Sequence, residues 1–130
     1  MFFPPNKPFR FLLPAYLLIL LVLVLFPFSS VGVEGLNNTY VVKLRLDHLL
    51  HVLAFVPLYP LLVVALKPRG GWHLLMVFIL ACALAVALEG VQYFVDYRSF
   101  NPMDMLANGV GVVVGAVVSC WLFARSKFQE

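Results

Sequence analysis

The sequence has few charged residues. Of its 130 residues, 12% are Asp, Glu, Lys or Arg, whereas 63% are hydrophobic. A soluble domain carries about 25% charged residues, so this chain lacks the polar groups needed to cover a surface that faces water. This shortage excludes an ordinary soluble globular protein and favours a protein that lies within a membrane.

Three further shortages narrow the class. The chain has only two cysteines, Cys82 and Cys120. They are predicted to lie at membrane depths about 10 Å apart, so a disulfide is not expected. The basic residues are scattered, with no basic patch of the kind that binds nucleic acid. No internal repeat is found, so a single domain over residues 1–130 is predicted.

What the chain does have is four long apolar runs. A helix needs about 20 residues to cross the hydrocarbon core of a bilayer. Within lipid, each backbone group must be bonded inside its own segment, which favours helices. We therefore predict an all-α membrane protein, a four-transmembrane-helix bundle with spans at residues 11–28, 46–66, 72–95 and 103–123. Pro57 and Pro60 are expected to kink the second helix.

The first apolar run also has features of a secretory signal peptide. Lys7 and Arg10 precede it and small residues follow it. However, the run is longer than the apolar region of a usual signal peptide. Pro27 and Phe28 also stand where small residues would favour cleavage. A retained first helix is therefore the better interpretation.

Basic residues predict the orientation, because they concentrate in cytoplasmic loops. Six of the nine fall at the amino end, in the second connection or in the tail, which four spans place on one side: Lys7, Arg10, Lys67, Arg69, Arg125 and Lys127. The other three fall on the opposite side: Lys43, Arg45 and Arg98. Both termini are therefore predicted to be cytoplasmic.

Polar residues gather near the ends of three predicted spans. They fall at the start of the second span, near the end of the third, and at or just before the start of the fourth: Asp47, His48, His51, Glu89, Gln92, Arg98, Asp104 and Asn108. Because successive helices alternate in direction, the three groups are expected at one membrane face, which the predicted orientation makes extracytoplasmic. A charged side chain at the bilayer centre costs about 2.5–3.5 kcal/mol. The deepest of them, Glu89, therefore most needs a partner, and we predict one shared site.

Residue spacing in the fourth span supports this site. Asp104, Asn108, Gly111 and Gly115 advance by four, three and four positions, so they form one stripe on a helix. Glycines in such a stripe let a neighbouring helix approach closely. Gly111 and Gly115 are therefore predicted to be helix-packing residues, and the same packing would carry Asp104 and Asn108 inward.

The segments DHLLHVLAF and LEGVQYFVDYRSFNPMDMLANGVGVVVGA, together with the four spans, resemble the VanZ-like family of small bacterial membrane proteins. The family's Asp-x-x-x-His, Glu-x-x-Gln and Arg…Asp-x-x-x-Asn-x-x-Gly elements are matched in order by Asp47 and His51, by Glu89 and Gln92, and by Arg98, Asp104, Asn108 and Gly111. One departure is His48, which stands where the family commonly has lysine, so a titratable group replaces a fixed charge.

The resemblance implies a multi-pass protein of the bacterial cytoplasmic (inner) membrane and the cell envelope. The founding member is associated with resistance to the glycopeptide antibiotic teicoplanin. Under this interpretation the eight polar residues would bind a lipid-linked envelope precursor or a glycopeptide, and the protein's other partner is the lipid bilayer itself.

Three other interpretations of the site stay open. The first is a structural cluster that fixes how the helices meet. The second is a site of ion or proton coupling, for which four helices form a small bundle unless they assemble into a homo-oligomer. As a membrane-embedded hydrolase or transferase, its catalytic candidates are His51, Asp47 and Glu89, with a histidine as general base. Two histidines and three carboxylates are enough ligands for a metal version, but no His-Glu-x-x-His element is present to give it specificity. Neither a metal nor a cofactor is expected.

Overall fold

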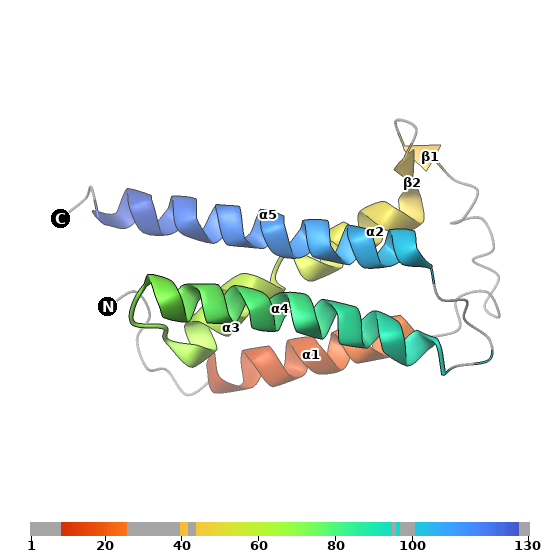
Figure 1. The fold of residues 1–130 in the computed structure, drawn as a ribbon, viewed down its shortest axis with the longest axis horizontal. Helices are drawn as coiled ribbons and strands as arrows, with labels where there is room; N and C mark the ends of the chain where they lie inside the picture. The colour runs from red at the N-terminus through yellow and green to blue at the C-terminus, as the bar shows by residue number, and fades with distance from the viewer. Residues whose placement is uncertain (1–8, 26–39, 42–43, 95, 97–100, 128–130) are drawn as a thin grey trace.

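The computed structural model describes residues 9–25, 40–41, 44–94, 96 and 101–127. It consists mainly of helices: α1 (Phe9–Leu25), α2 (Leu46–Phe55), α3 (Leu58–Leu66), α4 (Gly71–Gln92) and α5 (Pro102–Lys127). Two strands of two residues each, β1 (Tyr40–Val41) and β2 (Leu44–Arg45), pair antiparallel just before α2. The helices form an elongated bundle in which the amino end of α1 and the carboxyl end of α5 lie at the same end (Figure 1).

The outer surface of the bundle is apolar. Large hydrophobic side chains are exposed on the long helices, including Ile19 of α1, Ile79 of α4 and Val117 of α5. A soluble monomer rarely exposes so extensive an apolar surface, whereas lipid chains cover one without cost.

Three helical stretches are long and apolar enough to cross a membrane: His48–Leu66, Gly71–Gln92 and Pro102–Arg125. Within α1, Phe11–Leu23 is a shorter apolar stretch of helix. The fold class predicted from the sequence, an all-α bundle of membrane type, is confirmed.

The second predicted span, residues 46–66, is two helices. Helix α2 ends at Phe55 and α3 begins at Leu58, because Pro57 has no N–H to continue the helix and its ring crowds the preceding turn. At this interruption the hydroxyl of Tyr16 on α1 donates a 2.5 Å hydrogen bond to the carbonyl oxygen of Ala54. The sequence predicted a kink here, and the structure has a break that α1 helps to stabilise.

The other boundaries lie close to the predicted ones. Helix α1 begins two residues before the predicted first span and ends at Leu25, and residues 26–28 of that span lie outside the described part of the chain. Helix α4 stops three residues before the predicted end, and α5 continues four residues beyond its predicted end.

Helix α5 packs on α2 and α3 along its glycines. A Cβ atom on Gly111 would lie 2.4 Å from the carbonyl oxygen of Val52, and one on Gly115 would lie 2.2 Å from that of Val56. Both distances are far shorter than van der Waals contact, so glycine is needed for this approach. Pro60 has no N–H to bond the Val56 carbonyl within the helix, and the Gly115 hydrogen that replaces Cβ points at that oxygen instead.

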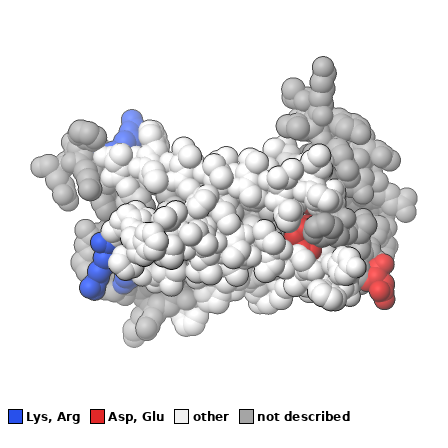
Figure 2. All heavy atoms as spheres, viewed as in Figure 1, with Lys and Arg blue, Asp and Glu red and all other residues white. Residues whose placement is uncertain are grey.

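Charged side chains lie toward the two ends of the bundle. The described Lys and Arg side chains, Lys67, Arg69 and Arg125, are exposed at one end, which we call the basic end (Figure 2). Trp72 and Trp121 are exposed at this end too, and the Arg125 guanidinium lies 4.5 Å from the centre of the Trp121 ring. Basic residues beside tryptophan are typical of a membrane–water interface. The described Asp and Glu side chains lie in the other half of the molecule (Figure 2).

Candidate functional site

The candidate site forms where the first turns of α2 and α5 meet the last turns of α4. Because α4 runs opposite to α2 and α5 (Figure 1), these turns come level with one another. Two described polar side chains come from each helix: His48, His51, Glu89, Gln92, Asp104 and Asn108. We call these six residues the polar cluster, and the end of the bundle that contains them, opposite the basic end, the polar end.

The side chain of Asn108 on α5 is hydrogen-bonded to both other helices of the site. Its Nδ2 donates to Oε2 of Glu89 at 3.2 Å, and its Oδ1 lies 2.9 Å from Nδ1 of His51. When Glu89 is ionised it only accepts hydrogen bonds, so the amide presents its NH2 group to Glu89 and its oxygen to His51. It follows that Nδ1 of His51 carries a hydrogen and donates. The chain of hydrogen bonds runs from α2 through α5 to α4.

His48 and Asp104 form a second contact between α2 and α5. Nε2 of His48 lies 3.3 Å from Oδ1 of Asp104, a distance at which the two form an ion pair when the imidazole is protonated. The His48 side chain is 22% exposed and that of Asp104 is 9% exposed. His48, the residue that departs from the family pattern, is therefore the more exposed member of this pair.

Four members of the polar cluster are buried. Glu89 and Asn108 are 0% exposed, Gln92 is 1% exposed and Asp104 is 6% exposed. Burying a polar group without a hydrogen-bond partner costs a few kcal/mol, and burying a charge costs more. Side chains this deep must therefore be compensated by the hydrogen bonds within the cluster or by a further group that enters it.

The cost of burying Glu89 is only partly offset by hydrogen bonds. Asn108 serves Oε2, and the backbone of Asn101, at the start of α5, interacts favourably with this carboxyl group. Oε1 is also buried, and it accepts no hydrogen bond from the described residues. A buried carboxylate oxygen in this state lacks the hydrogen bond that would offset the cost of its burial.

Two of the eight residues predicted from the sequence cannot be placed in the cluster. The backbone of Asp47 belongs to α2, but its side chain lies outside the described part of the structure, and Arg98 lies outside it entirely. Their expected roles in the site therefore stay predictions.

The catalytic role predicted for His51, with Glu89 orienting it, stays a prediction, but the structure shows how the two residues are linked. The ring of His51 reaches Glu89 through the amide of Asn108, which orients the imidazole without bringing the carboxylate charge directly to Nδ1. Among the described residues, no three His, Cys, Asp or Glu side chains are grouped so that they could hold a metal ion.

One residue near the site was missed by the sequence analysis. Oδ1 of Asn101 accepts a 3.1 Å hydrogen bond from the backbone N–H of Met103, which caps the start of α5. The dipeptide Asn101-Pro102 carries the signal, because asparagine is a favoured N-cap and proline is favoured at the first helical position. The cap fixes where α5 begins and so the level at which Asp104 and Asn108 lie.

A lipid-exposed helical bundle with a buried polar cluster at one end defines a membrane protein with a candidate site inside its helices. The chain belongs to the VanZ/LLP1 family, which it matches over residues 13–123. This match includes all six residues of the polar cluster. No curated protein and no solved structure matches the chain.

Proposed function

We propose that the polar cluster binds the polar head of an envelope lipid, of the kind that carries a lipid-linked cell-envelope precursor. The observation that carries this proposal is the buried Oε1 of Glu89, which lacks a donor among the described residues. A ligand that donates a hydrogen bond from a hydroxyl, amide or ammonium group supplies the missing partner. The sugars and peptides of envelope precursors are rich in such donors.

The remaining members of the cluster suit the same ligand. The hydrogen-bonded chain of His51, Asn108 and Glu89 holds its side chains in one arrangement before the ligand arrives, which lowers the entropy cost of binding. His48, whose side chain is 22% exposed, is within reach of a ligand head that approaches the cluster from outside. Arg98, expected from the sequence beside the site, would engage a phosphate or carboxylate bidentately.

The orientation supports a ligand in the outer leaflet. Lys67, Arg69 and Arg125 lie at the basic end, which the positive-inside rule assigns to the cytoplasm. The polar end then faces outward in the cytoplasmic membrane of a bacterium. A precursor lies in this outer leaflet before it is added to the cell wall. A glycopeptide antibiotic reaches the same leaflet, and the resemblance to a family associated with teicoplanin resistance makes it the second candidate ligand of this site.

The proposal is tested by identifying the lipid that copurifies with the full chain. The protein is extracted from bacterial membranes in mild detergent, and its retained lipid is compared with total membrane lipid by mass spectrometry. We expect one class with a donor-rich head to be enriched about tenfold or more, since one hydrogen bond to a charged group is worth about 1.5–3 kcal/mol.

Each other outcome has a definite meaning. Retained lipid of the same composition as the membrane contradicts the proposal and supports a purely structural cluster. A cleaved or transferred product in place of intact lipid identifies a membrane-embedded hydrolase or transferase. Release of the enriched lipid on addition of teicoplanin shows that the antibiotic competes for the same site.

A further inference from the structure

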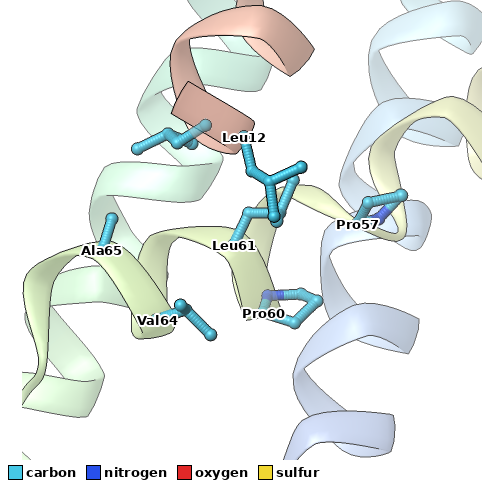
Figure 3. Close-up of a pocket in the computed structure, with 7 residues that line it drawn as sticks. Leu12, Pro57, Pro60, Leu61, Val64 and Ala65 are labelled. Carbon is cyan, nitrogen blue, oxygen red and sulfur yellow. The ribbon is translucent and has the colours of Figure 1, made fainter. Parts of the chain in front are cut away.

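An apolar groove lies between α1 and α3, on the basic half of the bundle and away from the polar cluster. Its volume is about 280 Å³, and the described residues that line it are all hydrophobic. Figure 3 shows Leu12 of α1 standing above Leu61, Pro60, Val64 and Ala65 of α3. The geometry points to a binding site for one anionic phospholipid, with an acyl chain in this groove and its phosphate at the cations that follow α3.

The groove suits a hydrocarbon chain. Its lining runs along α3 from Pro57 to Ala65, which is about 12 Å of helix at 1.5 Å per residue. Leu12 is 45% exposed and Ala65 is exposed as well, so the groove opens to the surroundings of the bundle. For a chain in a membrane those surroundings are acyl chains, and a polar occupant would find no hydrogen-bond partner among the lining side chains.

The charge at the end of the groove favours an anionic head. Lys67 and Arg69 follow the last lining residue, Ala65, by two and four positions, and both are exposed. Lys67 has a left-handed backbone conformation (φ 50°), and its N–H donates to the carbonyl oxygen of Val63 at 3.0 Å. The chain therefore turns directly at the end of the groove, with both cations in that turn.

These cations have no acidic neighbour in the sequence. The stretch from residue 57 to residue 88 contains no Asp or Glu, so the sequence around Lys67 and Arg69 offers them no acidic partner. A lipid phosphate with no compensating positive charge in its head would pair with these cations at the depth where a headgroup lies. The proposal concerns the end of the bundle opposite the polar cluster and does not rest on the function proposed for that cluster.

The site is tested by native mass spectrometry of the full chain released from nanodiscs that contain equal amounts of dioleoylphosphatidylglycerol and dioleoylphosphatidylcholine. We expect one phosphatidylglycerol per chain to be retained over phosphatidylcholine by about tenfold, because each basic residue near a membrane surface contributes appreciably to anionic lipid binding. The double variant Lys67→Gln/Arg69→Gln is expected to lose this preference. Ala65→Phe, which fills the groove from an exposed position, is expected to lose the retained lipid.

Arg125→Gln is the matched control. Arg125 is also an exposed cation at the basic end, but it lies over the Trp121 ring on α5 and follows no groove-lining residue. Its replacement is expected to leave the preference unchanged. The proposal is overturned if Arg125→Gln acts as strongly as the double variant, if folded Ala65→Phe retains the lipid, or if the groove is occupied by a second copy of the chain, seen as a lipid-free dimer. Should Ala65→Phe not fold, the comparison of the two charge variants still decides.

Discussion

Gly115→Ala is expected to lower the free energy of unfolding by about 2–3 kcal/mol, at the upper end of the usual cost of overpacking. The added Cβ would lie 2.2 Å from the carbonyl oxygen of Val56, a backbone atom that cannot rotate away. Helix α5 would have to move off α2 and α3, and this displacement would carry Asn108 away from Glu89. The measurement is reversible unfolding in mixed micelles, followed by circular dichroism.

Gly109→Ala is the control for this prediction. A Cβ atom on Gly109 would have no neighbour within 4 Å outside its own turn of helix. Alanine is favoured over glycine within a helix by about 1 kcal/mol, so this variant is expected to be as stable as the wild type or slightly more stable. Equal losses at residues 109 and 115 would show that α5 is not packed through its glycine stripe.

Asn108→Asp is expected to cost about 3–5 kcal/mol, the usual penalty for an uncompensated buried charge. The change sets a second carboxylate about 3.2 Å from Oε2 of Glu89 and removes the NH2 group that serves that oxygen. Both groups are 0% exposed, so water does not screen their repulsion. Unfolding in mixed micelles again measures the loss.

The double variant Asn108→Asp/Glu89→Gln is expected to recover most of that stability. The carboxylate introduced on α5 accepts from Nδ1 of His51, and the amide introduced on α4 donates to it, so the three-helix chain of hydrogen bonds is rebuilt with its charge moved. Glu89→Gln alone is expected to cost less than about 1 kcal/mol, because an amide oxygen still accepts from Asn108. Additive losses in the double variant would contradict the hydrogen-bonded chain.

The helices could be predicted from the sequence because lipid offers the backbone no hydrogen-bond partners. In lipid an apolar run of about 20 residues must satisfy its backbone internally, so α4 and α5 lie within four residues of their predicted bounds. The interruption between α2 and α3 was anticipated as a kink, because Pro57 and Pro60 lie in this span. That Tyr16 donates to Ala54 across it could not be predicted, because the pattern of residues does not say which helices are neighbours.

The sequence could predict which residues lie near one another in the candidate site, but not which of them are in contact. Alternating helix direction brought the starts of α2 and α5 and the end of α4 to one face, and helical spacing put Asp104 and Asn108 on one stripe. Which partner each side chain meets depends on the rotation of every helix about its axis, and each residue turns the helix by about 100°. The contacts of His48 with Asp104 and of His51 with Asn108 therefore could not be predicted from the sequence.

The central claim, that the polar cluster is a ligand site, is tested most directly by one variant and a paired measurement. Lipid retained by purified Glu89→Gln is quantified alongside its free energy of unfolding. The account predicts stability within about 1 kcal/mol of the wild type and loss of the enriched lipid. An unchanged lipid content together with a loss of stability as large as that of Asn108→Asp would contradict it and assign Glu89 to holding the helices together.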